Sequence, residues 1–422
     1  MAEWRSLSKY DRSVRALSRP KHNFLPYGRQ LIDDEDIAAV AEALRGDFLT
    51  TGPAIEQFEA ALLEAVGGEF AIACSSGTAA LHLAALALEL APGDAVVVPS
   101  LTFLATANAV RYVGGEVVFA DIDPESGQML PRHLEEALRR PGGEKSRAVF
   151  PVCLTGAISD PVALAAAAGD CRIVYDACHA LGTTYRSDAG VVSVGNCQDA
   201  DMATFSFHPV KTIALGEGGA VTTNNSALAE RLRLMRNHGM TRAPDDFVNL
   251  EMAFDLNGDP NPWYYEMAEP GFNYRLTDIQ CALGLSQIGK LDVFSARRRT
   301  LAAKYRDCLQ PIAPYVRPLE TPDGCDPVLH LFSVLIDFAA LDIPRSKVMN
   351  ELRKMGIGTQ VHYIPVHKQP YYRQRYGDIT LPGVDAYYDR TLSLPLFAGM
   401  SDDDIDRVVQ ALAEVLQLQT KL

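Results

Sequence analysis

The sequence lacks the features that mark secreted, membrane-spanning and nucleic-acid-binding proteins. It has no run of about 18 uncharged apolar residues, and its start, Met1-Ala-Glu-Trp-Arg-Ser, forms no apolar signal segment. We therefore expect neither secretion nor a membrane span. A basic tract is also missing, and 39 Lys and Arg residues against 53 Asp and Glu residues give a net charge of −14. A chain with this charge pattern cannot neutralise a row of phosphates, so we expect no nucleic-acid partner.

Eight cysteines are present, but they form neither a CxxC pair nor the regular spacing of a disulfide framework. Most lie in apolar, strand-like segments, as free thiols do in a reducing compartment, so we expect a cytoplasmic protein. Histidine spacing indicates no metal site, because Pro365 lies between His362 and His367 and breaks helical spacing. The sequence thus predicts free thiols and no bound metal.

The chain has ample apolar sequence for a large core, since 48% of its 422 residues are apolar and 22% are charged. From Phe70–Cys74 to Arg172–Asp176, short and continuous apolar strands alternate with helices. That alternation predicts an α/β fold with a mainly parallel sheet covered on both faces. Two closely spaced strand-like runs follow at 202–207 and 219–223, where we expect the sheet to become mixed.

Three regions follow from the pattern along the chain. Residues 1–24 are polar and without apolar periodicity, which predicts an N-terminal arm. Residues 25–290 are expected to form the large domain, and residues 291–422 a smaller α/β domain. The expected elements of the smaller domain are strands at 329–336 and 359–362 and helices at 346–354 and 402–418. The polar segment 242–270 predicts a long loop, and Arg297–Arg299 a solvated helix face.

Thr277 and Gln280 have the spacing of a capping box that opens an amphipathic helix. Helical periodicity indicates the inward-facing residues Ile279, Ala282, Leu283 and Ile288. This helix would fix the turn before it, which carries Asn273.

Ligands of a parallel α/β sheet gather beyond the carboxyl ends of its strands, and three segments at such positions carry polar side chains. The first is Cys74-Ser-Ser-Gly-Thr78, between a strand and an apolar helix. Its small residues leave backbone N–H groups open at a helix N-terminus, where the helix dipole favours an anion such as phosphate. The plainer interpretation is an N-cap that serves only the helix.

The second segment begins at Asp176, which ends an apolar strand, and continues through His179. A half-buried carboxylate there would be stabilised by a cationic partner such as a protonated ring nitrogen, although strand-end aspartates often only close a turn. The third segment runs from Ser206 through Lys211 to Gly219. Lys211 lies between apolar sequence and a glycine-rich turn, where a desolvated amine can act as a nucleophile, whereas most lysines are solvated.

Taken together, a phosphate cradle, a strand-end Asp and a desolvated Lys are what pyridoxal 5′-phosphate (PLP) requires. Asp176 would keep the pyridine nitrogen protonated, so that the ring accepts an electron pair from the substrate. Lys211 would form the Schiff base and, once displaced, move the proton. Cys74 and Cys178, which lie beside these motifs, are expected to be small apolar fillers.

Six motifs in this order resemble the DegT/DnrJ/EryC1/StrS family of nucleotide-sugar aminotransferases, over residues 25 to about 418. The motifs are Ser76-Gly-Thr-Ala-Ala-Leu-His-Leu83, Pro99-Ser-Leu-Thr-Phe-Leu-Ala-Thr-Ala-Asn108, Asp176-Ala-Cys-His-Ala-Leu-Gly182, Ser206-Phe-His-Pro-Val-Lys211, Gly216-Glu-Gly-Gly-Ala-Val221 and Gly271-Phe-Asn-Tyr-Arg-Leu-Thr-Asp-Ile-Gln280. The resemblance implies a fold-type-I, aspartate aminotransferase-like PLP enzyme. It also implies a homodimer in which each active site is built from both subunits.

By this resemblance, Lys211 would carry the Schiff base and Asp176 would pair with the pyridine nitrogen. His179, where many relatives have Gln, would lie near the ring hydroxyl, and Phe103 would stack on the ring. Asn273 would reach the phosphate from the other subunit. The remaining phosphate ligands would be Gly77, Thr78 and Ser206.

Three stretches narrow the resemblance to the branch that aminates C4 of a UDP-linked 4-keto-6-deoxy-N-acetyl sugar on the route to pseudaminic acid. They are residues 235–240, 271–287 and 360–369. The residues that this branch implies near the substrate are Tyr27, Phe48, Leu49, Thr50, Tyr274, His362 and Tyr363. Because the substrate carries a diphosphate and the chain is acidic, we also expect local cations there, with Arg275 and Lys368 the candidates.

Several alternatives stay open at this point. The sugar could be another UDP-, dTDP- or GDP-linked 4-keto-6-deoxy sugar, and the amino donor, implied to be L-glutamate, is not fixed. PLP sugar dehydrases of the same fold have His where Lys211 stands. A desulfurase would have no use for Tyr274, His362 and Tyr363. A PLP-binding regulator would bring a DNA-reading module, for which the chain has no room.

Overall fold

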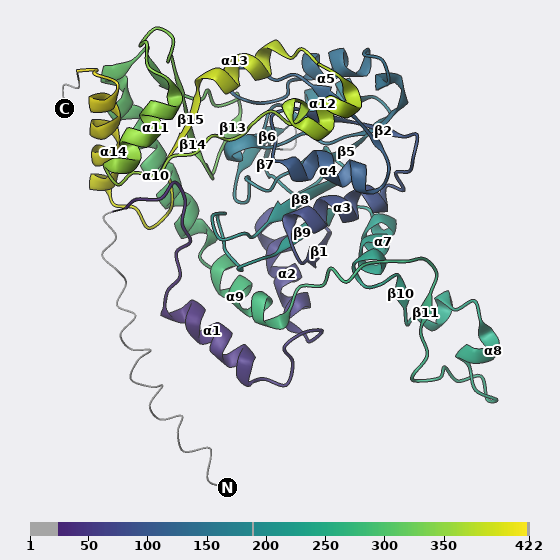
Figure 1. Cartoon of the computed structure of the whole chain (residues 1–422). Coiled ribbons are helices and arrows are strands. Elements are labelled where there is room, and N and C mark those ends of the chain that lie inside the picture. The colour runs from purple at the N-terminus through teal and green to yellow at the C-terminus, as the bar shows by residue number, and fades with distance from the viewer. Residues whose placement is uncertain (1–23, 188–189, 420–422) are drawn as a thin grey trace.

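The computed structural model describes residues 24–187 and 190–419, so the expected arm lies almost entirely outside the described residues. A seven-stranded sheet forms the centre of the molecule, in the order β1-β9-β8-β5-β4-β2-β3 (Figure 1). Its strands are β1 (Phe70–Cys74), β2 (Ala95–Pro99), β3 (Glu116–Ala120), β4 (Ser146–Val149), β5 (Arg172–Asp176), β8 (Met202–Ser206) and β9 (Gly219–Thr223).

Strands β8, β5, β4, β2 and β3 run parallel to one another, whereas β9 runs antiparallel to both its neighbours, β1 and β8. Every residue of β2 and of β9 is buried. Short strands that are apolar throughout form where helices cover both faces of a sheet. The prediction of a mostly parallel sheet that becomes mixed after residue 201 is therefore confirmed.

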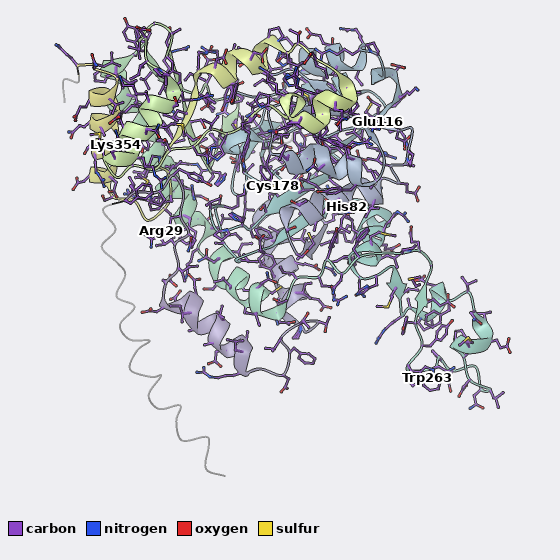
Figure 2. All side chains as sticks on the ribbon, viewed as in Figure 1. Arg29, His82, Glu116, Cys178, Trp263 and Lys354 are labelled. Atoms are coloured by element: carbon purple, nitrogen blue, oxygen red, sulfur yellow. The ribbon has the colours of Figure 1, made fainter. Side chains whose placement is uncertain are left out.

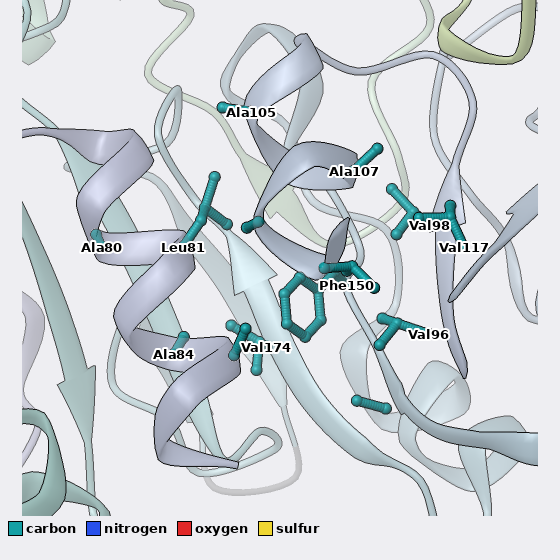
Figure 3. Close-up of a cluster of buried hydrophobic side chains, with 14 of the residues drawn as sticks. Ala80, Leu81, Ala84, Val96, Val98, Ala105, Ala107, Val117, Phe150 and Val174 are labelled. Atoms are coloured by element: carbon teal, nitrogen blue, oxygen red, sulfur yellow. The ribbon is translucent and has the colours of Figure 1, made fainter. Parts of the chain in front are cut away.

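Helices pack on the sheet and enclose two apolar clusters with it. In the cluster of Figure 3, Ala80 and Leu81 lie on the helix beside Phe150 and Val174 of the sheet region. No helix in the described ranges is long and apolar enough to cross a membrane. The helices of this part are α1 (Asp34–Arg45), α2 (Ala54–Val66), α3 (Gly77–Ala87), α4 (Leu104–Tyr112), α5 (Pro131–Leu138), α6 (Pro161–Ala168), α7 (Ser226–Arg236) and α9 (Asp278–Ile288).

A third apolar cluster lies in the C-terminal region, around a three-stranded antiparallel sheet in the order β12-β14-β15. Arg298 is 1% exposed here, and its guanidinium donates to the main-chain oxygens of Leu329, His330 and Leu396. The prediction of a solvated Arg297–Arg299 face is therefore wrong for Arg298. The elements are α10 (Leu291–Leu309), β12 (Val316–Pro318), β14 (Phe332–Ile336), α11 (Arg345–Lys354), β15 (Thr391–Leu394) and α14 (Asp402–Val415).

Two further helices of this region, α12 (Pro370–Tyr376) and α13 (Pro382–Arg390), return to the large sheet. The Tyr372 hydroxyl donates to Asn108 at 2.8 Å, and the main-chain N–H of Val366 donates to the Ser100 carbonyl at 2.9 Å. These contacts bring residues 362–372 to the carboxyl end of β2. The boundary at residue 290 stays a prediction.

One expectation about a strand is wrong, and one small sheet was missed. The segment 359–362 contributes one bridge, between Gln360 and Ser393, and the strand beside β14 is β15 instead. β15 is a short, half-polar run, Thr-Leu-Ser-Leu, so its sequence signal is weak although all four residues are buried. A small sheet of β6 (Thr184–Ser187), β7 (Gly190–Ser193) and β13 (Cys325–Asp326) was not expected at all.

The capping box of α9 is confirmed, since the Thr277 side chain accepts from the main chain of Gln280 and the Gln280 side chain accepts from that of Thr277. Its predicted inward face is wrong. The fully buried residues of α9 are Asp278, Cys281, Gly284 and Gln287. This face packs closely on α2, since a Cβ on Gly284 would lie 2.7 Å from the Phe58 ring.

The segment expected as a long loop, 242–270, forms an extension that projects from the body of the molecule (Figure 1). It contains α8 (Leu250–Ala253) and β11 (Glu266–Met267), and β11 pairs with β10 (Met240–Thr241), which directly precedes the segment. Phe247 packs on Phe254 and Tyr264 in a small core of its own. Trp263, 72% exposed, lies near the tip, as labelled in Figure 2.

Candidate active site

A cavity of about 340 Å³ opens at the carboxyl ends of β1, β5 and β8. This is the edge of the sheet at which the sequence placed its three polar segments. Ten of the predicted site residues line the cavity: Tyr27, Gly77, Thr78, Phe103, Asp176, His179, Ser206, Lys211, His362 and Tyr363.

The phosphate segment forms the N-terminus of α3. Ser76 caps the helix, because its hydroxyl accepts the main-chain N–H of Ala79 at 3.1 Å. The N–H groups of Gly77 and Thr78, in the first turn, have no hydrogen-bond partner within residues 24–187 and 190–419. A Cβ on Gly77 would lie 2.7 Å from the Ser206 Cβ, so only glycine allows this close approach. Both interpretations therefore apply: Ser76 caps the helix, and the open N–H groups of Gly77 and Thr78 suit an anion.

Asp176, at the end of β5, is 6% exposed and held by two hydrogen bonds. The Thr106 hydroxyl of α4 donates to one carboxylate oxygen at 2.6 Å, and the main-chain N–H of Cys178 donates to the other at 3.2 Å. A buried carboxylate fixed in this way favours a cationic partner, such as a protonated ring nitrogen.

Lys211 follows β8 on a turn in which its main-chain N–H donates to the His208 carbonyl. Burial lowers the pKa of the Lys211 amine, against the opposing influence of Cys178 and Asp176. A lowered pKa makes the neutral, nucleophilic amine easier to form. Burial also raises the pKa of the Cys178 thiol well above its usual value, and that of Cys74 to about 12, so both stay protonated.

A short chain of hydrogen bonds fixes His179. Its Nδ1 accepts the main-chain N–H of Thr155 at 3.3 Å, so the ring proton lies on Nε2, which donates to the Tyr363 oxygen at 3.1 Å. The Tyr363 O–H can then donate to a ligand in the cavity. Burial lowers the pKa of His179 well below 6.5, so the ring stays neutral.

Aromatic side chains line the rest of the cavity. Phe103, at the N-cap of α4, is 54% exposed, and its ring centroid lies 5.7 Å from that of Tyr363. His362 donates or accepts at 2.8 Å with the Ser393 hydroxyl, and its ring lies 5.3 Å from that of Tyr27. An open aromatic face such as that of Phe103 suits the stacking of a planar ring.

Six predicted residues do not line the cavity of their own chain: Asn273, Phe48, Leu49, Thr50, Tyr274 and Arg275. They lie on two adjoining segments, since the main-chain N–H of Asp278 donates to the Leu49 carbonyl and Thr50 pairs with Thr277. The exposure of Asn273 fits a residue that reaches another subunit, and the roles of all six stay predictions.

The two candidate cations for a diphosphate, Arg275 and Lys368, differ in whether a neighbouring carboxylate already pairs with them. Arg275 donates to Asn237 at 2.6 Å, and its Nε is buried without a partner among the described residues. Lys368 forms an ion pair with Asp385 at 2.5 Å and does not line the cavity. Arg275 therefore has donor capacity left, whereas Lys368 is already neutralised.

Two site residues were missed in the sequence. Thr106, which holds Asp176, lies inside a quoted motif, but its contact with Asp176 spans 70 residues of the chain. His330 lines the cavity from the C-terminal region, just before β14. The sequence places His330 inside the expected strand 329–336, where a histidine resembles many buried histidines, so only the fold brings it to the site.

The residues present fit PLP. Open N–H groups at α3 suit its phosphate, buried Asp176 suits its ring nitrogen, and the Lys211 amine on the same cavity suits its aldehyde. When bound, PLP supplies an electron sink for bonds broken at the carbon next to the amine.

A site of this kind on a mostly parallel α/β sheet defines a PLP-dependent transferase of fold type I. The chain belongs to the DegT/DnrJ/EryC1/StrS aminotransferase family, whose model matches residues 30–413. It is thus a sugar aminotransferase, of enzyme class 2.6.1, that uses PLP and moves an amino group between an amino donor and a nucleotide sugar.

Three relatives cover nearly the whole chain. The spore coat polysaccharide biosynthesis protein SpsC of Bacillus subtilis (strain 168) is 37% identical over 402 residues, which is 94% of this chain and 98% of SpsC. Helicobacter pylori PseC, an aminotransferase involved in the biosynthesis of pseudoaminic acid, is 28% identical with a TM-score of 0.83, covering 93% of this chain and 99% of PseC. The PLP form of Spr1654 from Streptococcus pneumoniae is 27% identical with a TM-score of 0.82, covering 93% and 99%.

Proposed function

We propose that this enzyme transfers an amino group from L-glutamate to C4 of a UDP-linked 4-keto-6-deoxy-N-acetyl sugar, in pseudaminic acid biosynthesis. The observation that carries the transfer chemistry is the desolvated amine of Lys211 in one cavity with Asp176. The choice of sugar is supported by the resemblance at residues 360–369 and by the similarity to PseC.

In this proposal the residues of the cavity divide the chemistry among them. Lys211 would hold the cofactor through its amine and, once the amino donor has taken its place, would move the proton at the reacting carbons. Asp176 would keep the ring nitrogen protonated, while Gly77, Thr78 and Ser206 would hold the phosphate. The O–H of Tyr363, directed by His179, donates to an oxygen of the cofactor or the substrate. Because one cavity serves the amino acid and the sugar in turn, ping-pong kinetics follow.

A second candidate is C4 amination of a different nucleotide sugar for a surface polysaccharide. The relative SpsC, named for spore coat polysaccharide biosynthesis, favours it, and its identity to this chain is higher than that of PseC. The two candidates share every step at Lys211 and differ only in the epimer and the base that the cavity accepts.

We further propose that the enzyme is a homodimer with shared active sites and that it acts in the cytoplasm. In one chain, Asn273 and Arg275 stay outside the cavity, although the family resemblance assigns Asn273 to the phosphate. In the dimer, Asn273 of the partner subunit would complete each phosphate site. The extension 242–270 supports association, because its exposed apolar side chains include Val248, Leu250, Met252, Leu256, Trp263, Tyr265 and Met267.

A substrate panel tests the proposal. The holoenzyme is incubated with L-glutamate and a set of UDP- and dTDP-linked 4-keto-6-deoxy sugars, and 2-oxoglutarate and the aminated sugar are followed together. Turnover should be fastest with the UDP-linked altrosamine-type 4-ketone. Faster turnover of another 4-ketone would support the second candidate, and amination of none of them would refute both.

A further inference from the structure

His330 is a buried histidine of the cavity wall to which the proposed function assigns no task. It is 3% exposed, and its ring centroid lies 4.5 Å from that of His179. Within the described residues, its Nδ1 is buried and has no hydrogen-bond partner. An unpaired buried nitrogen is unfavourable, so native proteins retain few of them. One that borders a ligand cavity calls for an explanation.

The main chain holds His330 in place and leaves its ring without a protein partner. Its N–H donates to the Thr155 carbonyl at 2.8 Å, and its carbonyl accepts from Arg298 at 3.3 Å. The other buried histidines of the cavity each use a ring nitrogen within the protein: His179 with Thr155 and Tyr363, and His362 with Ser393. In the described part of the chain, the ring of His330 makes no hydrogen bond.

The charges around His330 keep it neutral while the cavity holds no anion beside it. Burial lowers the pKa of His330 well below 6.5, and Lys211, His179, Arg298 and His362 lower it further. Every group in this set is cationic or can become so. An anion placed beside the ring would reverse the balance and stabilise the protonated form.

The amino donor brings such an anion. Among the residues that line the cavity in 24–187 and 190–419, Lys211 is the one lysine or arginine, and the proposed function assigns it to the cofactor. Two carboxylates, Asp176 and Glu217, also belong to the wall. An amino acid therefore enters a cavity with no spare permanent cation for its carboxylate, whereas the uncharged ring of a sugar has no such need.

We propose that His330 binds a carboxylate of the amino donor and takes up a proton from solvent as the donor enters, with no equivalent task when the sugar occupies the cavity. This assignment rests on the proposed function, because it assumes that one cavity serves both substrates. It makes His330 a residue that selects the amino donor in the first half of the reaction.

Binding of glutarate, a dicarboxylate without an amino group, tests the assignment without turnover. Isothermal titration of the holoenzyme in two buffers of different ionisation enthalpy, between pH 6 and 8, measures affinity and proton uptake together. Because the free ring is already neutral at pH 6, uptake should be close to one proton from pH 6 up to the pKa of the ring in the complex, and the dissociation constant should rise about tenfold per pH unit over that range. His330→Asn and His330→Gln should abolish the uptake and the pH dependence. His133→Asn, at a buried histidine that caps α5 outside the cavity, should leave both unchanged.

Half-reactions separate this assignment from the proposed function. Cofactor absorbance follows each half-reaction. His330→Asn should slow the conversion of the cofactor by glutamate at least tenfold. The rate at which the nucleotide sugar converts the cofactor back should change less than twofold. Glutarate binding without proton uptake, no binding at all, or equal slowing of both halves would overturn the role of His330. Loss of glutarate binding in Arg275→Gln, with His330→Asn binding glutarate as the wild type does, would assign the carboxylate to Arg275 instead. Failure of every sugar with the wild-type enzyme would refute the proposed function and leave the glutarate result standing.

Discussion

At the scale of single residues, the site depends on groups that hold the reactive side chains: the Thr106 hydroxyl donates to Asp176 at 2.6 Å, and the Thr155 N–H donates to His179 at 3.3 Å. The sequence predicts the reactive groups better than the groups that hold them. Asp176 and Lys211 stand at strand ends, so the fold class alone places them at one edge of the sheet. Thr106 contacts Asp176, and His330 contacts His179, only because distant parts of the chain pack together, and neither residue has a local pattern that distinguishes it. Arg298 was predicted in solvent because charged runs on helices usually are, yet three carbonyls bind it in the interior.

Thr106→Val removes the hydroxyl that donates to Asp176 but keeps the shape of the side chain. A hydrogen bond to a charged group contributes about 1.5–3 kcal/mol, so we expect kcat/KM to fall about tenfold or more. We also expect weaker retention of the cofactor on dialysis. Thr300→Val, at an exposed helical threonine, is the matched control and should change neither quantity. Wild-type kinetics in Thr106→Val would show that Asp176 does not depend on this bond.

Burial of His362 makes stability depend on pH. Its pKa is lowered from 6.5 to about 3, first by burial and then by Lys211. The folded protein keeps the ring neutral where the unfolded chain takes up a proton, so this stability is full above pH 6.5 and is lost as the pH falls towards 3. At pH 5 the loss is about 2 kcal/mol. Urea unfolding of the holoenzyme at pH 7 and pH 5 measures the free energy of unfolding that is lost between these pH values. This loss should be smaller in His362→Gln than in the wild type, by about 2 kcal/mol. An equal loss in variant and wild type would contradict this account.

At the scale of elements, the turn Leu154–Gly156 connects two parts of the site. Thr155 adopts φ 61°, a left-handed conformation that is rare for a β-branched residue. In that conformation its N–H faces His179 and its carbonyl accepts from His330. Sequence patterns identify helices and strands by periodicity, and a three-residue turn has none. The same limit explains why β15 and the hairpin of β6 and β7 were missed.

Gly156→Ala should disrupt this turn. Gly156 has φ 110°, and an added Cβ would lie 2.4 Å from the Val328 carbonyl oxygen and 2.9 Å from that of His179. We expect a loss of about 2–4 kcal/mol in the free energy of unfolding, with weakened activity because His179 must shift. Gly93→Ala is the matched control, since its φ is 105° and no atom lies within 4 Å of the added Cβ. It should lose only about 1 kcal/mol. Similar losses in both variants would mean that the close contacts contribute nothing.

At the scale of the whole molecule, the sheet, its order of motifs and ten of the predicted site residues follow from the sequence. The surfaces that meet a second copy do not follow from the sequence, because the composition of a segment does not show whether its apolar side chains are exposed. The extension 242–270 carries seven acidic residues and one basic residue, which favours a loop, yet its apolar side chains point outward around a minimal core. Such exposure is typical of an interface.

Replacing the exposed apolar residues of the extension should weaken association. We expect the variant Leu250→Ser, Met252→Ser, Trp263→Ser to raise the dissociation constant of the homodimer at least tenfold in sedimentation-equilibrium experiments, because it removes apolar surface from the interface. Activity should fall with it at low protein concentration. Glu251→Ser with Asn257→Ser, on the same extension, should leave both unchanged. A monomeric wild type, or a variant as dimeric as the wild type, would contradict the proposed role.

A reaction with glutamate alone tests whether Lys211 supports transfer of the amino group in two separate half-reactions. Holoenzyme mixed with excess L-glutamate and no sugar should release one 2-oxoglutarate per bound cofactor, with loss of the visible cofactor absorbance, and then stop. Lys211→Ala should release none. Release of no 2-oxoglutarate by the wild type, continued release beyond one per site, or undiminished release by Lys211→Ala would contradict the account.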